Sequence, residues 1–168
     1  MERPIQSISL AGSQLDEVRH VCALFANGEE EYRVLLLINT EVYLRDGRFD
    51  QDRMIAMFEE VAESARVAEG FPMSRIVCRM DWATGDHSRI QNVIEFESRV
   101  NDVWRRYDDA VICTYHLGQL SGDAVIDIMR THPMVIIGGY LQPNPFFTRP
   151  EEFLREFRER KSGRTSVE

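Results

Sequence analysis

Apolar and polar positions follow two different periods along the last third of the chain. Val111–Tyr115 and Met134–Gly139 are short apolar runs, and the amphipathic segment Asp123–Thr131 lies between them. Apolar runs of four to eight residues on both sides of a helical period are typical of a strand–helix–strand unit with buried parallel strands. Ligands of such sheets usually bind beyond the carboxyl ends of the strands. Here those ends carry Tyr115 and His116, and then Gly138, Gly139 and Tyr140.

The first half of the chain predicts further strands and helices. Short strands are expected at His20–Ala26, Glu41–Leu44 and Ser74–Ala83, and a helix is expected from Glu29 to Leu36. After a turn at residues 45–48, Asp50 is suited to cap a helix with an apolar stripe that runs to about Glu69. Gly70 and Pro72 then end that helix.

Two more helices are predicted in the second half. The first runs from His87 to about Tyr107, and one face of it is apolar: Ile90, Val93, Ile94, Val100, Val103 and Trp104. Glu95 and Glu97 lie in the middle of this helix and need hydrogen-bond donors if they are buried. The last helix begins at Pro150, after the proline-rich segment Gln142–Pro150, which is not expected to form a long regular element.

These patterns predict one domain. Residues 1–18 are polar and mixed and are interpreted as a partly ordered lead-in, residues 19–160 as a single α/β domain, and residues 161–168 as a flexible tail. A chain of 168 residues is long enough to bury a substantial core.

Composition and charge narrow the function. The net charge of −8 opposes non-specific binding to nucleic acid, which requires a basic surface. The sequence has neither an apolar run of about 20 residues, long enough to span a bilayer, nor a signal-peptide pattern, so a cytoplasmic protein is expected. Its three cysteines, Cys22, Cys78 and Cys113, occur in or beside apolar runs and are interpreted as reduced core thiols.

Sequence motifs of common enzymes are absent. There is no GxxxxGK[ST] loop for phosphate, no further glycine and helix start after Gly138-Gly139 for a dinucleotide, and no GxSxG, HExxH or CxxC motif. The chain is therefore expected not to be an enzyme, and no cofactor is predicted.

Two thiols and two imidazoles raise the question of a metal site. His20 and Cys22 occur on one predicted strand, and Cys113 and His116 occur on or beside another. Alternation along a strand places Cys113 and Tyr115 on one face and His116 on the opposite one. This separation argues against a shared ion, and no metal site is predicted.

Polar and aromatic residues near strand ends are better suited to a small-molecule pocket. Trp82, Tyr115, His132 and Asn144 have this placement, with Phe146 and Phe147 close in sequence. Each also has a structural alternative. His132 can cap the carbonyls of the preceding helix, and Asn144-Pro145 can form a turn.

An ordered set of short segments resembles the MEDS domain, the methanogen/methylotroph DcmR sensory domain. The segments are His20–Phe25, Glu30–Tyr32, Tyr43–Asp50, Met80–Ala83, Glu95–Glu97, Cys113–Tyr115, Arg130–Pro133, Gly138-Gly139, Asn144–Phe147 and Pro150–Leu154. They run in the order of the family from about residue 19 to residue 155. No single segment is specific, but the ordered set is.

The resemblance implies a three-layer α/β/α sandwich with a mainly parallel sheet, a RecA/KaiC-like core that lacks a P-loop. It also implies a prokaryotic sensor of small hydrocarbon derivatives that acts beside histidine kinases, anti-sigma-type kinases or DNA-binding domains. Two departures from the family are visible. The segment between Tyr32 and Tyr43 is shorter than usual, and Cys78 and Arg79 stand where small or acidic residues are expected. The first departure, if it is a true deletion, removes one strand and opens the pocket on that side.

The resulting hypothesis is a non-enzymatic sensory domain that binds a small apolar or weakly polar ligand and regulates a signalling partner. The residues expected to line its site are His20, Cys22, Trp82, Tyr115, His132 and Asn144. Neither direct nucleic-acid binding nor membrane insertion is expected, and the oligomeric state is left open, with a homo-oligomer among the alternatives. A rival hypothesis is a protein-interaction module whose degenerate pocket binds no small ligand.

Overall fold

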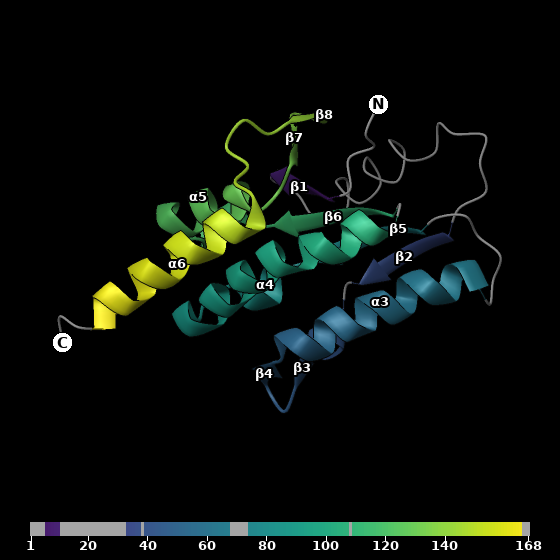
Figure 1. Ribbon diagram of the computed structural model, residues 1–168, viewed down its shortest axis with the longest axis horizontal. Helices are drawn as coiled ribbons and strands as arrows, with labels where there is room; N and C mark the ends of the chain where they lie inside the picture. The colour runs from purple at the N-terminus through teal and green to yellow at the C-terminus, as the bar shows by residue number, and fades with distance from the viewer. Residues whose placement is uncertain (1–5, 11–32, 38, 68–73, 108, 166–168) are drawn as a thin grey trace.

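A computed structural model describes residues 6–10, 33–37, 39–67, 74–107 and 109–165 of the chain (Figure 1). Six strands form one sheet: β1 (Gln6–Leu10), β2 (Arg33–Leu37), β5 (Ser74–Arg79), β6 (Ala110–Tyr115), β7 (Met134–Ile137) and β8 (Tyr140–Pro143). Two further short strands, β3 (Leu44–Arg45) and β4 (Arg48–Phe49), pair as a separate antiparallel hairpin. The described helices are α2 (Thr40–Tyr43), α3 (Gln51–Val67), α4 (His87–Arg106), α5 (Gly122–Arg130) and α6 (Pro150–Thr165).

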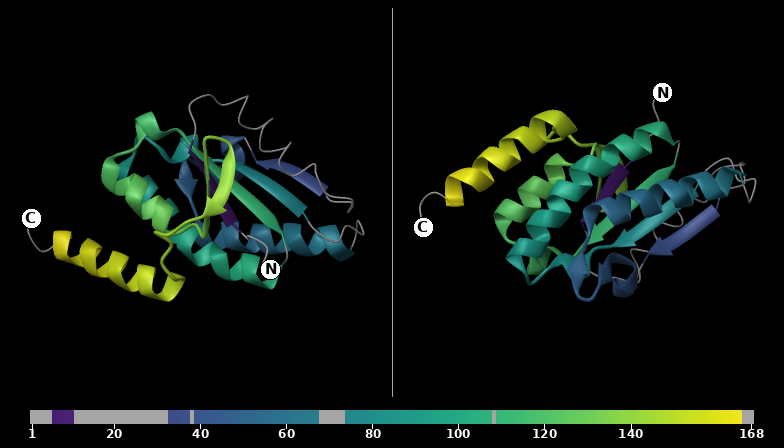
Figure 2. Two further views of the ribbon diagram at one scale, coloured as in Figure 1. Left: turned by 90° about the horizontal axis from the view of Figure 1, so that it is seen from above. Right: turned by 60° about the horizontal axis from the view of Figure 1, so that its bottom comes forward.

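The sheet has the order β2-β5-β6-β1-β7-β8, and only its last pair, β7 with β8, is antiparallel. Strand β1 lies between β6 and β7, so the first strand in the sequence is placed inside the sheet. The connections β2–α3–β5, β5–α4–β6 and β6–α5–β7 all advance in the same direction along this order. Because such crossovers are right-handed, α3, α4 and α5 cover the same face (Figure 2).

Apolar side chains are buried on both faces of the sheet. On the face that the helices cover, Ile76, Val111 and Val135 join a large cluster with residues of α3, α4, α5 and α6. The intervening strand residues Val77, Ile112 and Ile136 form a second buried cluster, which alternation assigns to the opposite face. The domain is an α/β sandwich with a mainly parallel sheet, in agreement with the predicted fold class.

Several predicted elements are confirmed. Helix α3 begins after Asp50, whose Oδ1 accepts a hydrogen bond from the Arg53 N–H at 3.0 Å. Helix α4 spans His87–Arg106, and the six apolar residues predicted for its inner face are all buried. The turn at residues 45–48 links β3 to β4 through positive φ angles at Asp46 and Gly47. Strand β6 begins one residue before the predicted run Val111–Tyr115, and α5, β7 and the start of α6 match their predictions closely.

Other predictions are wrong. Residues 33–37 form strand β2 and not the end of a helix, because Leu35 and Leu37 alternate with the exposed Leu36 in the pattern of a strand. Residues 40–43 form helix α2, capped by the Asn39 side chain, and not a strand. The shortened segment before Tyr43 therefore still contributes a strand and a helix turn.

The predicted boundaries of the domain within the chain also differ from the structure. Gln6–Leu10, expected in a lead-in outside the domain, forms β1. Helix α6 continues to Thr165, so residues 161–165 of the expected flexible tail are helical. The chain reverses at a turn formed by Gly138-Gly139, and strand β8 then pairs with β7. The start of the proline-rich segment belongs to β8. The strand predicted at His20–Ala26 lies outside the described residues.

No helix within the described ranges combines the length and the apolar character needed to cross a bilayer.

Candidate functional site

Polar side chains from three elements meet in the core between α4 and the sheet. Glu97 comes from the inner face of α4, Cys113 and Tyr115 come from β6, and His132 follows the end of α5. All four residues are at most 3% exposed. Because buried ionisable groups are costly unless they are paired or bound to metal, this group is the strongest candidate for a functional site. We call it the Glu97 cluster.

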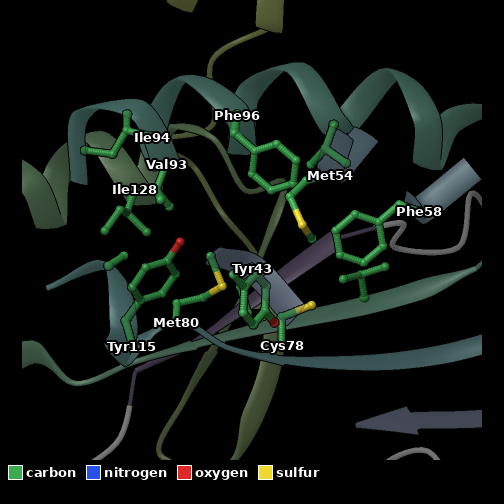
Figure 3. Packing of buried hydrophobic residues seen from close by; sticks show 14 of the residues in the cluster. Tyr43, Met54, Phe58, Cys78, Met80, Val93, Ile94, Phe96, Tyr115 and Ile128 are labelled. Atoms are coloured by element: carbon green, nitrogen blue, oxygen red, sulfur yellow. The ribbon is translucent and has the colours of Figure 1, made fainter. Parts of the chain in front are cut away.

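Glu97 connects the other three residues. Its Oε1 accepts a hydrogen bond from the Tyr115 hydroxyl at 2.7 Å. Its Oε2 lies 3.6 Å from the Cys113 sulfur, within hydrogen-bond range for a thiol, and 3.6 Å from Nε2 of His132. Figure 3 shows Tyr115 rising from β6 toward the α4 layer, which is how its hydroxyl reaches a helix residue.

The orientation of His132 follows from the end of α5. Its Nδ1 lies 2.8 Å from the carbonyl oxygen of Ile128, a distance that requires the ring to donate a proton to this acceptor. The Thr131 hydroxyl donates to the same carbonyl at 2.8 Å. His132 therefore caps the helix, as the structural alternative proposed, and at the same time its Nε2 faces Glu97.

Burial sets the protonation of this cluster. It raises the pKa of the Tyr115 hydroxyl well above its usual value, and the nearby Glu97 charge raises it further. The pKa of the Cys113 thiol is also raised well above its usual value, first by a hydrogen bond with the Cys78 thiol and then by burial. Burial lowers the pKa of His132 against the opposing Glu97 charge, so the imidazole is neutral at neutral pH.

A small cavity adjoins the Glu97 cluster. Its volume is about 10 Å³, room for about one water molecule. Six of its ten lining residues are apolar or aromatic without such a group: Phe58, Met80, Phe96, Val100, Trp104 and Val111. The other four bring a thiol, a hydroxyl or a carboxyl: Tyr43, Cys78, Glu97 and Cys113. The indole N–H of Trp104 is buried and has no acceptor among the described residues. Tyr43 donates its hydroxyl proton to the Leu37 carbonyl at 2.8 Å.

A larger pocket lies on the surface between α4, α5 and α6. Its volume is about 430 Å³, and its lining is mainly polar or charged: His87, Ser88, Gln91, Ser121, Asp123, Ala124, Asp127, Phe157, Arg160 and Lys161. Arg160 and Asp127 form an ion pair across it at 2.7 Å. This chemistry does not suit an apolar ligand.

Four of the predicted site residues lie in the part of the chain that the structure describes. Two of them, Tyr115 and His132, are brought together by their shared contact with Glu97. Trp82 is half-buried and stacks on Tyr43 with 4.7 Å between ring centroids. It therefore contacts a residue of the cavity lining but is not part of the lining itself. His20 and Cys22 lie outside the described residues.

Asn144 is placed away from the Glu97 cluster. Its Nδ2 donates to the carbonyls of Met129 at 2.6 Å and His132 at 2.7 Å, and its Oδ1 accepts from the Phe146 N–H at 3.0 Å. The turn proposed as its structural alternative is confirmed. Through the His132 carbonyl, Asn144 also helps to position the residue whose ring enters the cluster.

Glu97, Cys78 and Tyr43 were not among the site residues predicted from the sequence. The signal for Glu97 was present, because it follows Val93 by four positions and precedes Val100 by three, which places a carboxylate inside the apolar stripe of α4. Cys78 and Cys113 are register partners on β5 and β6, a relation that depends on strand order. Both are buried thiols, as predicted.

Comparison with known proteins identifies the family of the chain. No match was found among the curated proteins. The sequence model of the MEDS family, described as the MEthanogen/methylotroph, DcmR Sensory domain, matches residues 14–133, which is more than half of the 168 residues. The match includes Glu97, Cys113, Tyr115 and His132. The chain therefore belongs to the MEDS family of sensory domains.

Proposed function

We propose that this chain is a non-enzymatic sensory domain that binds a small apolar or weakly polar molecule in the core cavity beside the Glu97 cluster and regulates a signalling partner. The observation that carries the proposal is the chemistry of the cavity. Aromatic and aliphatic side chains form most of its wall, and Glu97 and Cys113 form a polar end. A few polar groups in an apolar wall are what a small-molecule site requires.

The size of the cavity supports a sensor mechanism. With room for about one water, it cannot take a hydrocarbon derivative unless the surrounding side chains move. The ligand would therefore bind an expanded conformation more tightly than the compact one and shift the balance between them. A ligand that fitted both conformations equally would transmit no signal.

Helix α4 is suited to relay this change. It carries Glu97, Phe96, Val100 and Trp104 into the cavity region, and it contacts α3, α5 and α6. A displacement of α4 would therefore reach the outer helices, including α6 at the end of the described chain. The partner would be a histidine kinase, an anti-sigma factor or a transcription regulator, the types of protein that the family resemblance implies.

Thermal shift measurements with small alcohols, halocarbons and aromatic compounds test ligand binding. At least one class should raise the unfolding temperature of the wild-type chain. Val100→Ile, which adds a methylene group to the cavity wall, should abolish this stabilisation. Val93→Ile adds the same group to the same helix at a buried position outside the cavity lining, and it should retain the response. A folded wild-type chain that no compound stabilises would contradict the proposal.

A protein-interaction module is the second candidate, and the β7–β8 edge favours it. Tyr140 is 78% exposed and Phe146 is 62% exposed, and Ile137 and Leu141 are also exposed near them. Strand β8 is the last in the sheet order, so its outer backbone edge can pair with another chain. Loss of a co-purified partner on Leu141→Lys, with no loss on Val100→Ile, would favour this candidate over ligand sensing.

A further inference from the structure

The Glu97 cluster combines three kinds of metal ligand. A carboxylate oxygen of Glu97, the Cys113 sulfur and a ring nitrogen of His132 all lie within 4.8 Å of one another. From the sequence alone, Cys113 was a candidate ligand together with His20, Cys22 and His116, and no metal site was predicted. The fold supplies different partners, because α4 and the end of α5 both pack against the face of β6 that carries Cys113.

The separations approach those of a tetrahedral ion. Zinc–ligand bonds of about 2.0 to 2.3 Å at tetrahedral angles place neighbouring ligand atoms about 3.3 to 3.6 Å apart. The Glu97 Oε2 to His132 Nε2 distance is 3.6 Å, and the Glu97 Oε2 to Cys113 Sγ distance is also 3.6 Å. Small rotations of these side chains would therefore bring all three atoms to bonding distance from a common centre.

Hydrogen bonds orient two of the three ligands for this purpose. Donation from His132 Nδ1 to the Ile128 carbonyl gives the neutral ring its lone pair at Nε2, the nitrogen that faces Glu97. Donation from the Tyr115 hydroxyl to Glu97 Oε1 turns the other oxygen, Oε2, toward Cys113 and His132. Metal-binding histidines and carboxylates in proteins are commonly held by such outer hydrogen bonds.

Charge and space also fit a divalent ion. A thiolate and a carboxylate neutralise a 2+ ion, so the complex adds no net charge to the core. Binding breaks the S–H bond of Cys113, forms a sulfur–metal bond and releases the proton to the buffer. The adjoining cavity, lined by Glu97 and Cys113, has room for one water as a fourth ligand.

We propose that Glu97, Cys113 and His132 bind a divalent ion of the zinc type through Oε2, Sγ and Nε2. Sulfur and nitrogen ligands select zinc, and cobalt as its spectroscopic substitute, over magnesium and calcium, which prefer oxygen ligands alone. The site goes beyond the proposed sensing of an organic ligand and does not depend on it, because the metal is bound by the chain itself.

Cobalt binding to the reduced, chelator-treated full chain tests the site with no organic ligand present. One equivalent of Co²⁺ should produce a thiolate-to-cobalt charge-transfer band and strong tetrahedral visible bands, and Zn²⁺ should displace both. Cys113→Ser should lose the charge-transfer band. Thr114→Ser, which keeps a hydroxyl at the next position of β6 on the opposite face of the sheet, should keep it. Tyr115→Phe should weaken binding about 10- to 100-fold by releasing Glu97.

Circular dichroism checks that each variant is folded. X-ray absorption of the zinc-loaded wild-type chain needs no variant, and its spectrum should show one sulfur among four nitrogen, oxygen or sulfur neighbours. Three outcomes in the cobalt experiment would overturn the proposal: a folded wild-type chain without a charge-transfer band, a band that persists in Cys113→Ser, or equal loss of the band in Thr114→Ser. An absorption spectrum with no sulfur neighbour, or with several, would also overturn it. A positive cobalt result with no thermal response to organic compounds would retain the metal site and reject the proposed ligand pocket.

Discussion

At the scale of single residues, Glu97 is a buried carboxyl group that contacts three other buried side chains. It is 1% exposed, yet it takes a hydrogen bond from Tyr115 and faces Cys113 and His132. Burying a carboxylate costs free energy, and the contacts with its partners offset this cost. If one hydrogen-bond donor is removed, the remaining contacts must offset the same cost, so the contributions of the partners depend on one another. Substitutions around it should therefore cost more than their lost volume suggests.

Tyr115→Phe isolates one of these contacts. The change keeps the ring and removes the hydroxyl that donates to Glu97 at 2.7 Å. We expect the free energy of unfolding to fall by about 2 kcal/mol, the range for a hydrogen bond to a charged group. Urea unfolding of the metal-free chain measures this. Tyr140→Phe, at an exposed tyrosine, should change it by less than about 0.5 kcal/mol; equal effects of the two changes would contradict the assigned role.

Asn144 offers a test of structure against ligand contact. Asn144→Ala removes two donations to backbone carbonyls and one acceptor for the Phe146 N–H, so we expect a loss of about 2 to 3 kcal/mol in unfolding free energy. Asn144→Asp keeps the acceptor but loses both donations, and it should be at least as destabilising. If both variants unfold like the wild type in urea, then the loop does not depend on Asn144, and the predicted ligand role gains support.

At the scale of elements, the helices and strands that were predicted correctly are those that the local sequence pattern determines. Helix α4 and strand β6 were predicted because their apolar periods are long and bounded by a cap or a turn. Residues 33–36 and 41–43 were predicted wrongly, because a few apolar residues fit either period. Pairing with β5 makes residues 33–37 a strand, and residues 40–43 form a helix. The Glu97 cluster combines both cases. Tyr115 and His132 were selected from strand and helix ends, but Glu97 joins them only through helix–sheet packing.

The docking of α6 against α5 should depend on pH. Arg130 on α5 donates to Glu156 on α6 at 2.6 Å, and this hydrogen bond is the main cause that lowers the pKa of Glu156. A lowered pKa in the folded state gives stability that is complete above the ordinary carboxyl pKa and is lost as the pH falls through the folded value. The stability advantage of the wild type over Glu156→Gln should therefore shrink between about pH 6 and about pH 3.

Urea unfolding at several pH values measures this difference. Glu159→Gln, an exposed change on the same helix, is the matched control, and its difference from the wild type should not follow the same course. An advantage over Glu156→Gln that stays constant across the acid range would show that the Arg130–Glu156 contact does not stabilise the fold.

At the scale of the whole molecule, the first strand holds the sheet together. Strand β1 pairs with β6 on one side and with β7 on the other, so it joins the β2–β5–β6 part to the β7–β8 part. A prediction based on apolar runs missed this strand, because Gln6–Leu10 contains serines. Its assignment depends on partners that are distant in the sequence.

Deletion of residues 1–10 should therefore disrupt the fold and not only trim it. Both neighbours of β1 would lose their backbone hydrogen bonds to it, and buried unpaired backbone groups are costly. We expect the shortened chain to lose its cooperative urea transition, followed by circular dichroism. Deletion of residues 1–4 leaves β1 whole and is the control. A sharp transition of wild-type size in the shorter chain would show that β1 is dispensable.

The position of β1 also has a consequence for how the protein folds. Ser7 pairs with Ile112 and with Met134, so β1 has partners that leave the ribosome much later than it does. Contacts so distant in sequence slow folding, because a long loop must close before any pairing energy is gained. During synthesis β1 must therefore wait for β6 and β7, and the centre of the sheet is completed only after its β2–β5–β6 side is already available.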